Sequence, residues 1–206
     1  MANYNLEVTY EYACNKMRTK EPAEMARNSG AGWDGNKGVF TLQYLGEEYL
    51  ITYPESKVSF ASRSDEVPLK DQAFLLHYLC TANGAPMQGK YISFKELPDG
   101  AIYTDPFYRR AIEPMLKIFG NNHELFLRVA HKLGGVRHSI GDVSVIVPVL
   151  PKVSITYVMW SADDEFPASG NILFDASAAN YLPTEDYAVA ASNVVYKMAG
   201  MAREAK

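Results

Sequence analysis

Two apolar runs in the second half of the chain dominate its hydrophobic pattern. Val143 to Leu150 and Val153 to Trp160 contain no charged residue and are rich in β-branched side chains. Runs of this length and composition are typical of strands buried on both faces in the middle of a sheet. Pro148 and Pro151 lack the amide donor that a strand ladder needs, so we place them at a bulge or between the two strands.

Several other segments carry apolar residues at helical spacing. The first predicted helices are Asn5 to Met17, a short one from Glu21-Pro22 to Gly30, and one that follows Asp65 to Lys70 and runs through Cys80. Further along the chain, a helix capped by Asp105 and opened by Pro106 runs to Phe119, and two more are predicted at Glu124 to Leu133 and at Thr184 to about Ala202. Thr184 is expected to cap the last helix by accepting a hydrogen bond from a first-turn amide. Glu185 and Asp186 then lie favourably at the positive end of the helix dipole.

Shorter segments have the composition or the alternation of strands. The predicted strands are Val39 to Leu45, Glu48 to Tyr53, Lys57 to Ala61, Tyr91 to Leu97 and Ile172 to Phe174, besides the two central runs. Ser29 to Gly38 is interpreted as turns and Val136 to Asp142 as a loop. Clustered strands with short connections indicate an α+β fold, with a mixed, largely antiparallel sheet of about seven strands packed against helices. Residues 1–206 are expected to form a single domain.

Composition narrows the class of protein. The chain has 206 residues, is 48% hydrophobic and 21% charged, and carries a formal net charge of −4. Nucleic-acid binding favours a basic surface, so we do not expect it here. No apolar run approaches the length of a membrane helix, and the first residues do not resemble a signal peptide, so we expect a cytoplasmic protein without a membrane partner. The two cysteines, Cys14 and Cys80, are interpreted as buried small hydrophobes.

Acidic residues gather after the second central run. Asp163, Asp164 and Glu165 follow the predicted strand end, and Asp175, Glu185 and Asp186 come near them if the chain folds back. Carboxylate clusters can hold calcium or magnesium, but this spacing matches no EF-hand loop. A solvated loop and a helix start explain the same residues more simply. A divalent-metal-dependent hydrolase or transferase that uses this loop is kept as an alternative.

The four histidines form no HExxH pair, and no serine or cysteine nucleophile motif appears. A surface or core-edge histidine is the simpler interpretation of each. A single imidazole is nevertheless sufficient as an axial ligand to the metal of a tetrapyrrole. His131 and His138 flank Gly134-Gly135, where a planar ligand can approach the backbone closely. We take both as candidate metal ligands, with Trp160 and Phe166 as candidate aromatic residues of the binding cleft.

Several stretches together resemble a known family. They are AEMARNSGAG from Ala23, LLHYL from Leu75, YISFKELPDG followed by PFYRRAI, VLPKVSITYVMWSADDEFPASGNILFD, and YLPTED. Their order and spacing are similar to the bacterial and archaeal family called domain of unknown function 3786. Some members resemble corrinoid iron–sulfur proteins and carry a four-cysteine domain that this chain, with two cysteines, does not have. The resemblance implies corrinoid or haem chemistry in anaerobes, with no iron–sulfur cluster in this chain.

These observations favour a non-catalytic ligand-binding domain for a tetrapyrrole, either a corrinoid (cobalamin) or a haem. The partners expected are that cofactor and an iron–sulfur or corrinoid protein, and no catalytic residue is assigned. The metal-dependent enzyme is one alternative, and a protein-interaction module without a small ligand is the other.

Overall fold

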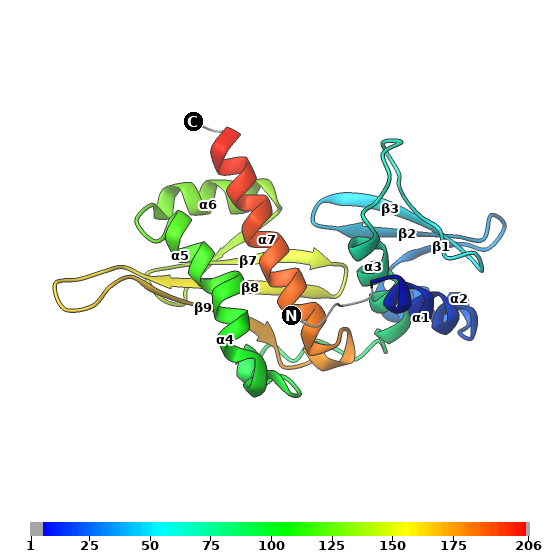
Figure 1. Ribbon diagram of the computed structural model, residues 1–206, viewed down its shortest axis with the longest axis horizontal. Helices are drawn as coiled ribbons and strands as arrows, with labels where there is room; N and C mark the ends of the chain where they lie inside the picture. Colours follow the sequence, from blue (N-terminus) through cyan, green and yellow to red (C-terminus); the bar gives the residue numbers. More distant parts are fainter. Residues whose placement is uncertain (1–5, 205–206) are drawn as a thin grey trace. The chain divides into compact units, whose positions relative to one another are not determined.

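The computed structural model describes residues 6–204 and divides into two compact units, each described here by itself (Figure 1). Unit 1 contains the residues up to Pro86 together with 150–152 and 180–182. Unit 2 contains 87–149, 153–179 and the residues from Pro183 onward. The α+β class is confirmed, but the strands form two sheets, of four and five strands, instead of one sheet of about seven. Single-domain behaviour of residues 1–206 stays a prediction.

Unit 1 combines a four-stranded meander with three helices. Its elements are α1 (Leu6–Arg18), α2 (Pro22–Ser29), β1 (Gly32–Asp34), β2 (Val39–Tyr44), β3 (Glu47–Thr52), β4 (Val58–Phe60) and α3 (Leu69–Thr81). The strands pair antiparallel in the order β1-β2-β3-β4. The predicted meander of β2, β3 and β4 is confirmed, and so are the three helices. The start of the first helix, predicted at Asn5, lies outside the described residues.

The core of unit 1 lies between one sheet face and α3. Phe40, Leu42 and Ile51 are fully buried, and the rings of Tyr44 and Phe74 pack at 5.0 Å. Cys14 and Cys80 are free thiols and both are buried, as the sequence predicted. Burial raises the pKa of the Cys80 thiol to about 11, which keeps it protonated and unreactive at neutral pH.

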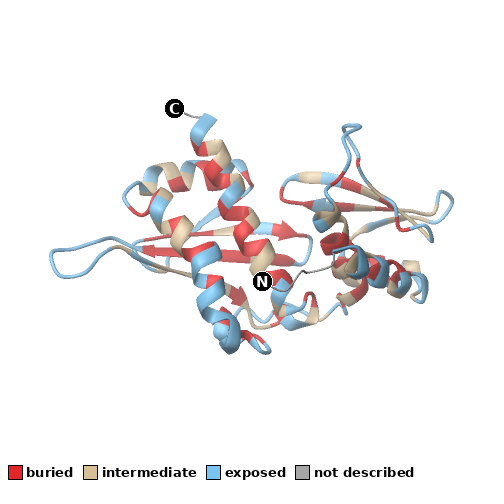
Figure 2. Ribbon diagram, viewed as in Figure 1, coloured by how far each residue is buried: buried red, intermediate tan, exposed pale blue. Residues whose placement is uncertain are grey.

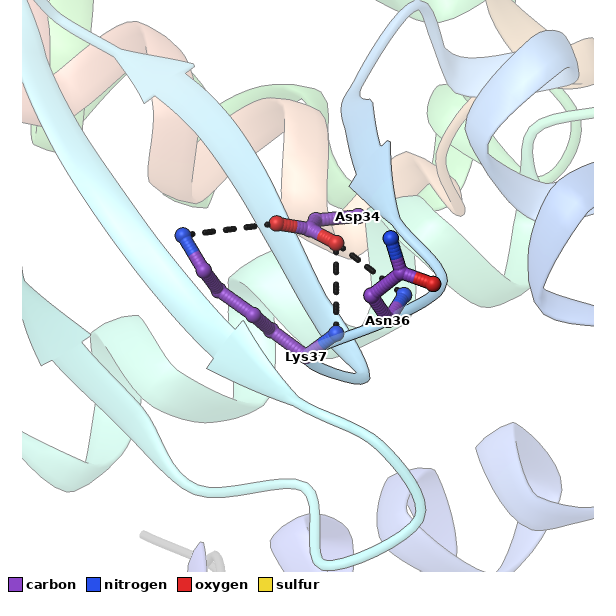
Figure 3. A network of polar contacts seen from close by, with 3 residues as sticks. All are labelled: Asp34, Asn36 and Lys37. Carbon is purple, nitrogen blue, oxygen red and sulfur yellow. Dashed lines mark hydrogen bonds and ion pairs between the residues drawn. The ribbon is translucent and has the colours of Figure 1, made fainter.

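The strand β1 corrects the interpretation of residues 29–38 as turns alone. A tight turn joins β1 to β2, and the Asp34 carboxylate closes it by accepting hydrogen bonds from the amides of Asn36 at 3.0 Å and Lys37 at 3.2 Å (Figure 3). The Lys37 ammonium lies 3.5 Å from the other carboxylate oxygen. The glycine-rich composition hid a strand of three residues because short edge strands carry few apolar positions.

Unit 2 contains the five-stranded sheet and the remaining helices. Its elements are β5 (Tyr91–Ser93), η1 (Phe94–Glu96), η2 (Gly100–Tyr103), α4 (Thr104–Phe107), the π-helical turn η3 (Tyr108–Ile112), α5 (Glu113–Phe119), α6 (His123–Lys132), β6 (Val136–His138), β7 (Val143–Leu150), β8 (Val153–Trp160), β9 (Ser169–Asp175) and α7 (Thr184–Glu204), with η4 (Ala178–Asn180) after β9. The strand order is β5-β9-β8-β7-β6.

The central position of β8 is confirmed. It is the middle strand of five, and Val153 and the residues from Ile155 to Met159 are buried on both faces (Figure 2). On one face, Figure 1 shows α5 and α7 crossing the strands, and the Tyr157 hydroxyl donates to Ala191 O in α7 at 3.0 Å. Pro148 lies inside β7, but the neighbouring strand β6 pairs only with Ser144 to Ile146. The missing amide of Pro148 is therefore tolerated beyond the end of β6.

Two local predictions in unit 2 are wrong, and a third, the helix that ends at Phe119, is confirmed in extent but not in regularity. The segment from Tyr91 to Leu97 is a strand only as far as Ser93, because Ser93 and Glu96 form a capping box that starts the 3-10 turn η1. Asp105 lies inside α4 and caps nothing. The helix predicted to run to Phe119 widens into a π-helical turn, because Pro114 has no amide to donate to Arg110 O.

The helix α7 begins at Thr184, as predicted, but the hydroxyl has a different role. Thr184 Oγ1 donates to Pro98 O at 2.6 Å instead of accepting from a first-turn amide. Pro183 O accepts the first helical bonds, from the amides of Asp186 and Tyr187. Within residues 6–204, no helix is both long and apolar enough to cross a bilayer.

Candidate functional site

His138 lies on a strand, not in a loop as predicted. Residues Val136–His138 form β6, an edge strand that pairs antiparallel with β7, and His138 lies opposite Ser144. The His138 side chain is partly buried, and its ring lies 5.3 Å from the ring of Tyr91, tilted by 54°. No hydrogen bond to this imidazole is found among the described residues. The ring is therefore held by packing while its nitrogens stay available.

Tyr91 and Trp160 lie on the same face of the sheet. Tyr157 contacts α7, and side chains alternate along a strand, so Trp160 lies on the opposite face, which we call the distal face. Ser93 pairs with Leu173, and Leu173 pairs with Thr156, which is also on the distal face. Tyr91, two residues before Ser93, shares that face. The distal face thus carries two partly exposed aromatic rings, with His138 against one of them.

Gly141 joins the loop after His138 to Trp160. Its φ of +66° is unfavourable for a side chain, and an added Cβ would lie 2.8 Å from Val158 Cγ1 and 3.2 Å from Trp160 Cε2. The amide of Asp142 donates to Met159 O at 3.1 Å. Only glycine fits this close approach, which fixes the β6–β7 loop against the end of β8.

A second polar group lies at the end of β8. Asp142 Oδ2 accepts a hydrogen bond from the amide of Ser161 at 2.7 Å. Hydrogen bonds from Ser161, followed by the charge of His123, lower the pKa of the Asp142 carboxyl. His123 is the first residue of α6, and its Nε2 is buried and has no hydrogen-bond partner among the described atoms. Asn122 takes the N-cap position of α6 by accepting from the amide of Leu125.

The other two candidate residues are not brought to His138 by any contact in the described residues. His131 is exposed in the last turn of α6, and its side chain makes no hydrogen bond or ring contact there. Phe166 is 66% exposed in the connection between β8 and β9. The structure therefore places His138 and Trp160 around one loop, while His131 and Phe166 stay predictions without a shared site.

The acidic residues serve local structure. Asp163 Oδ1 accepts from the amides of Glu165 and Phe166, which closes the turn that carries them. Asp175 accepts from Gln88, Gly89 and Ser177. Between residues 6 and 204, no group of three or more histidine, cysteine, aspartate or glutamate side chains is placed to hold one metal ion.

Sequence reasoning missed Tyr91, His123 and Gly141 as parts of this region. Tyr91 lies in β5 and His138 in β6, which are far apart in the chain and not paired with each other, so no local pattern reports the contact between their rings. Gly141 carried a weak signal, since Gly141-Asp142 directly precedes an apolar strand and is typical of a tight connection.

Comparison with known proteins gives one match. A family model described as domain of unknown function (DUF3786) matches residues 21–197, which is most of the chain. No curated protein and no solved structure matches it significantly.

Proposed function

The chain belongs to the DUF3786 family, and we propose that it is a non-catalytic binding protein for a flat, metal-bearing tetrapyrrole, a haem or a corrinoid such as cobalamin. The ligand lies on the distal face of the five-stranded sheet, with His138 as the axial ligand to the metal. The cofactor supplies any redox chemistry when bound, and the protein supplies orientation and surroundings. An iron–sulfur or corrinoid protein is the proposed protein partner.

The observation that carries the proposal is the placement of His138. Its ring is oriented by Tyr91 at 5.3 Å and has no hydrogen-bond partner among the described residues. A metal ligand needs an oriented ring with one nitrogen available, and here packing against Tyr91 orients the ring. Trp160 is 40% exposed on the same face and offers a flat apolar surface to a planar ligand.

The other histidines suit this role less well. His131 is exposed on α6 without a contact that orients it, His123 has its Nε2 buried, and His77 lies in α3 among buried residues. Of the two histidines that the sequence proposed, His138 is therefore the preferred metal ligand. His131 serves as the control position in the experiment.

Support for the metal-dependent hydrolase or transferase is weaker. Asp142, Asp163 and Asp175 all accept hydrogen bonds from backbone amides, those of Ser161, Glu165 and Gln88 respectively. A carboxylate occupied in this way has less capacity to bind a divalent cation, which takes several oxygen ligands at once.

The test is a spectroscopic titration of haem and of cob(II)alamin into the purified protein. The wild type is expected to develop the absorption bands of a histidine-ligated metal. His138→Ala should lose these bands, Tyr91→Leu should weaken binding by releasing the ring, and His131→Ala should bind like the wild type. Circular dichroism confirms that each variant is folded.

Two outcomes contradict the proposal. If the wild type binds neither ligand, the function is wrong. If binding is unchanged in His138→Ala and lost in His131→Ala, the tetrapyrrole remains and the assigned ligand is wrong.

A further inference from the structure

A basic, aromatic surface of unit 2 is exposed without an evident role in ligand binding. It consists of Ile102, Tyr103, Tyr108, Arg109 and Arg110, in η2 and η3 on either side of α4, and we call it the basic–aromatic surface. Ile102 is 76% exposed, Tyr103 46% and Tyr108 45%. Three large apolar side chains exposed within seven residues are typical of an interaction surface.

The buried side of the same segment packs without Ile102, Tyr103 or Tyr108. Phe107 and Ala111 are buried, and the Phe107 ring stacks on Phe94 at 4.0 Å with an interplanar angle of 5°. The packing of α4 and η3 onto the sheet is thus complete without Ile102, Tyr103 or Tyr108. Their exposure is a property of the surface, not a gap in the core.

The charges of the basic–aromatic surface are also available. Arg109 Nε donates to Asp105 O at 3.4 Å, and no ion pair within residues 6–204 involves Arg109 or Arg110. Arg109 and Arg110 are adjacent and both exposed. Two neighbouring guanidinium groups favour a partner with neighbouring carboxylates.

A segment with the complementary character lies in the β8–β9 connection of the same unit. We call residues 163–166 the acidic tip. Asp163 Oδ1 accepts from the amides of Glu165 at 2.9 Å and Phe166 at 2.7 Å, and the Asp163 amide donates to Phe166 O at 3.0 Å. This closed turn displays Asp164, Glu165 and Phe166. In Figure 1 the connection extends well beyond the helices of unit 2, and Figure 2 shows it exposed.

We propose that two copies of this chain form a symmetric dimer in which the acidic tip of each docks on the basic–aromatic surface of the other. In one chain no hydrogen bond, ion pair or ring contact found among the described residues joins the two segments, so each is available to a second copy. A two-fold axis makes both contacts at once and closes the assembly.

Charge and apolar area have different tasks in this dimer. Exposed ion pairs contribute little each, so Arg109 and Arg110 chiefly select and orient the acidic tip. Phe166 is the anchor, because its 66% exposed ring can be buried against Ile102 and the tyrosines. The turn held by Asp163 is already ordered, which lowers the entropic cost of docking.

The experiment measures the mass of the full-length protein by analytical ultracentrifugation over a range of concentrations. The wild type is expected to show a concentration-dependent dimer that weakens with added salt. Arg109→Glu with Arg110→Glu should weaken the dimer at least about ten-fold, and Asp164→Lys with Glu165→Lys should do the same. Lys132→Glu and Glu124→Lys on α6 each reverse one charge outside the two segments and should leave the dimer unchanged.

Mixing the two charge-reversed proteins gives the sharpest result. In the mixed pair both contacts join opposite charges again, so a heterodimer is expected from two proteins that are each monomeric. Phe166→Ser should weaken every dimer, with circular dichroism confirming the fold. A wild type that stays monomeric up to about 0.5 mM, where even weak specific interfaces associate, overturns the proposal. A dimer whose dissociation constant is unchanged by both charge reversals also overturns the proposal. So does a mixture of the two charge-reversed proteins that fails to associate.

Discussion

At the scale of single residues, the carboxylates of this chain mainly hold its turns. Asp34 closes the β1–β2 turn, Asp163 closes the acidic tip, and Asp175 connects the end of β9 to residues 88 and 89. The acidic cluster in the sequence indicated either metal binding or a solvated loop. The structure favours the loop, because short acidic side chains accept hydrogen bonds from nearby amides.

Asp175 makes the strongest of these connections. Its Oδ1 accepts from Gln88 N, Ser177 N and Ser177 Oγ, and its Oδ2 accepts from Gly89 N at 2.7 Å. Partial burial by itself raises the pKa of the Asp175 carboxyl, but the hydrogen bonds from Ser177, Gln88 and Gly89 outweigh it and hold the pKa below its usual value.

Asp175→Asn is expected to lower the free energy of unfolding by about 1–3 kcal/mol at pH 7, since a charged acceptor and one oxygen are lost. A depressed native pKa means that the stabilisation is complete above the unfolded pKa, near 4, and disappears as pH falls through the native value. Urea titrations of both proteins from pH 7 to pH 3 check this. Asp164→Asn, in an exposed loop, is the control. A difference that grows toward low pH would contradict the assignment.

The sequence identified His138 but not its neighbour. A histidine near two glycines and two apolar strands is visible in the sequence, whereas Tyr91 is distant in the chain and contacts the imidazole only in the folded structure. His123 is the first residue of α6, and the burial of its Nε2 could not be expected from that position in the sequence. Long-range packing of this kind leaves no local pattern.

At the scale of elements, the strength of the hydrophobic pattern determined what could be predicted. The bounds of β7 and β8 agree with the apolar runs, because strands buried on both faces have an unmistakable composition. The strands β1 and β6 were missed, since each has three residues and lies beside glycines that indicated a turn or a loop. Pro114 was visible, but the sequence does not tell whether a helix breaks or widens at a proline.

A substitution in the central strand β8 tests directly whether this strand is buried on both faces. Ile155 is fully buried on the α7 face of β8, so Ile155→Asp places an unpaired carboxylate in the core at a cost of several kcal/mol. We expect insoluble or unfolded protein on expression. Ser154→Asp, the adjacent and less buried position, should cost about 1 kcal/mol or less. A soluble Ile155→Asp protein with a cooperative melting curve would show that the strand is not embedded as described.

At the scale of the whole molecule, the two units are discontinuous in sequence. Unit 1 includes residues 150–152 and 180–182 as well as the residues up to Pro86. Within it, the Tyr78 hydroxyl accepts from the amide of Lys152 at 3.1 Å and donates to Ser29 O at 2.6 Å. The Tyr181 hydroxyl donates to Ala85 O, and Asn83 bonds to Asn180. Local patterns gave the elements, but the division into two sheets depends on such distant contacts.

Because unit 1 is built from three separate segments of the chain, we expect that residues 1–86 alone do not reach the native state. The fragment loses the hydrogen bonds that residues 152, 180 and 181 make to Tyr78, Asn83 and Ala85. It also loses the buried side chains of Leu150, Tyr181 and Leu182, which leaves apolar surface uncovered. Trp33, packed 4.5 Å from Phe40, reports on unit 1. Its fluorescence in the fragment should change gradually with urea. In full-length Trp160→Phe, where Trp33 is the remaining tryptophan, it should change cooperatively. Matching cooperative curves would show that unit 1 is complete without the later segments.

The late position of residues 180–182 also has a consequence for synthesis on the ribosome. The first helices and the meander emerge early, yet the last segment of their unit follows Pro86 by roughly a hundred residues. At translation speeds of roughly 5–20 residues per second, the nascent chain waits roughly 5–20 s before that unit can close. During this interval the unfinished amino-terminal half is a substrate for chaperones, and slow or fast codons between the two segments would lengthen or shorten its exposure.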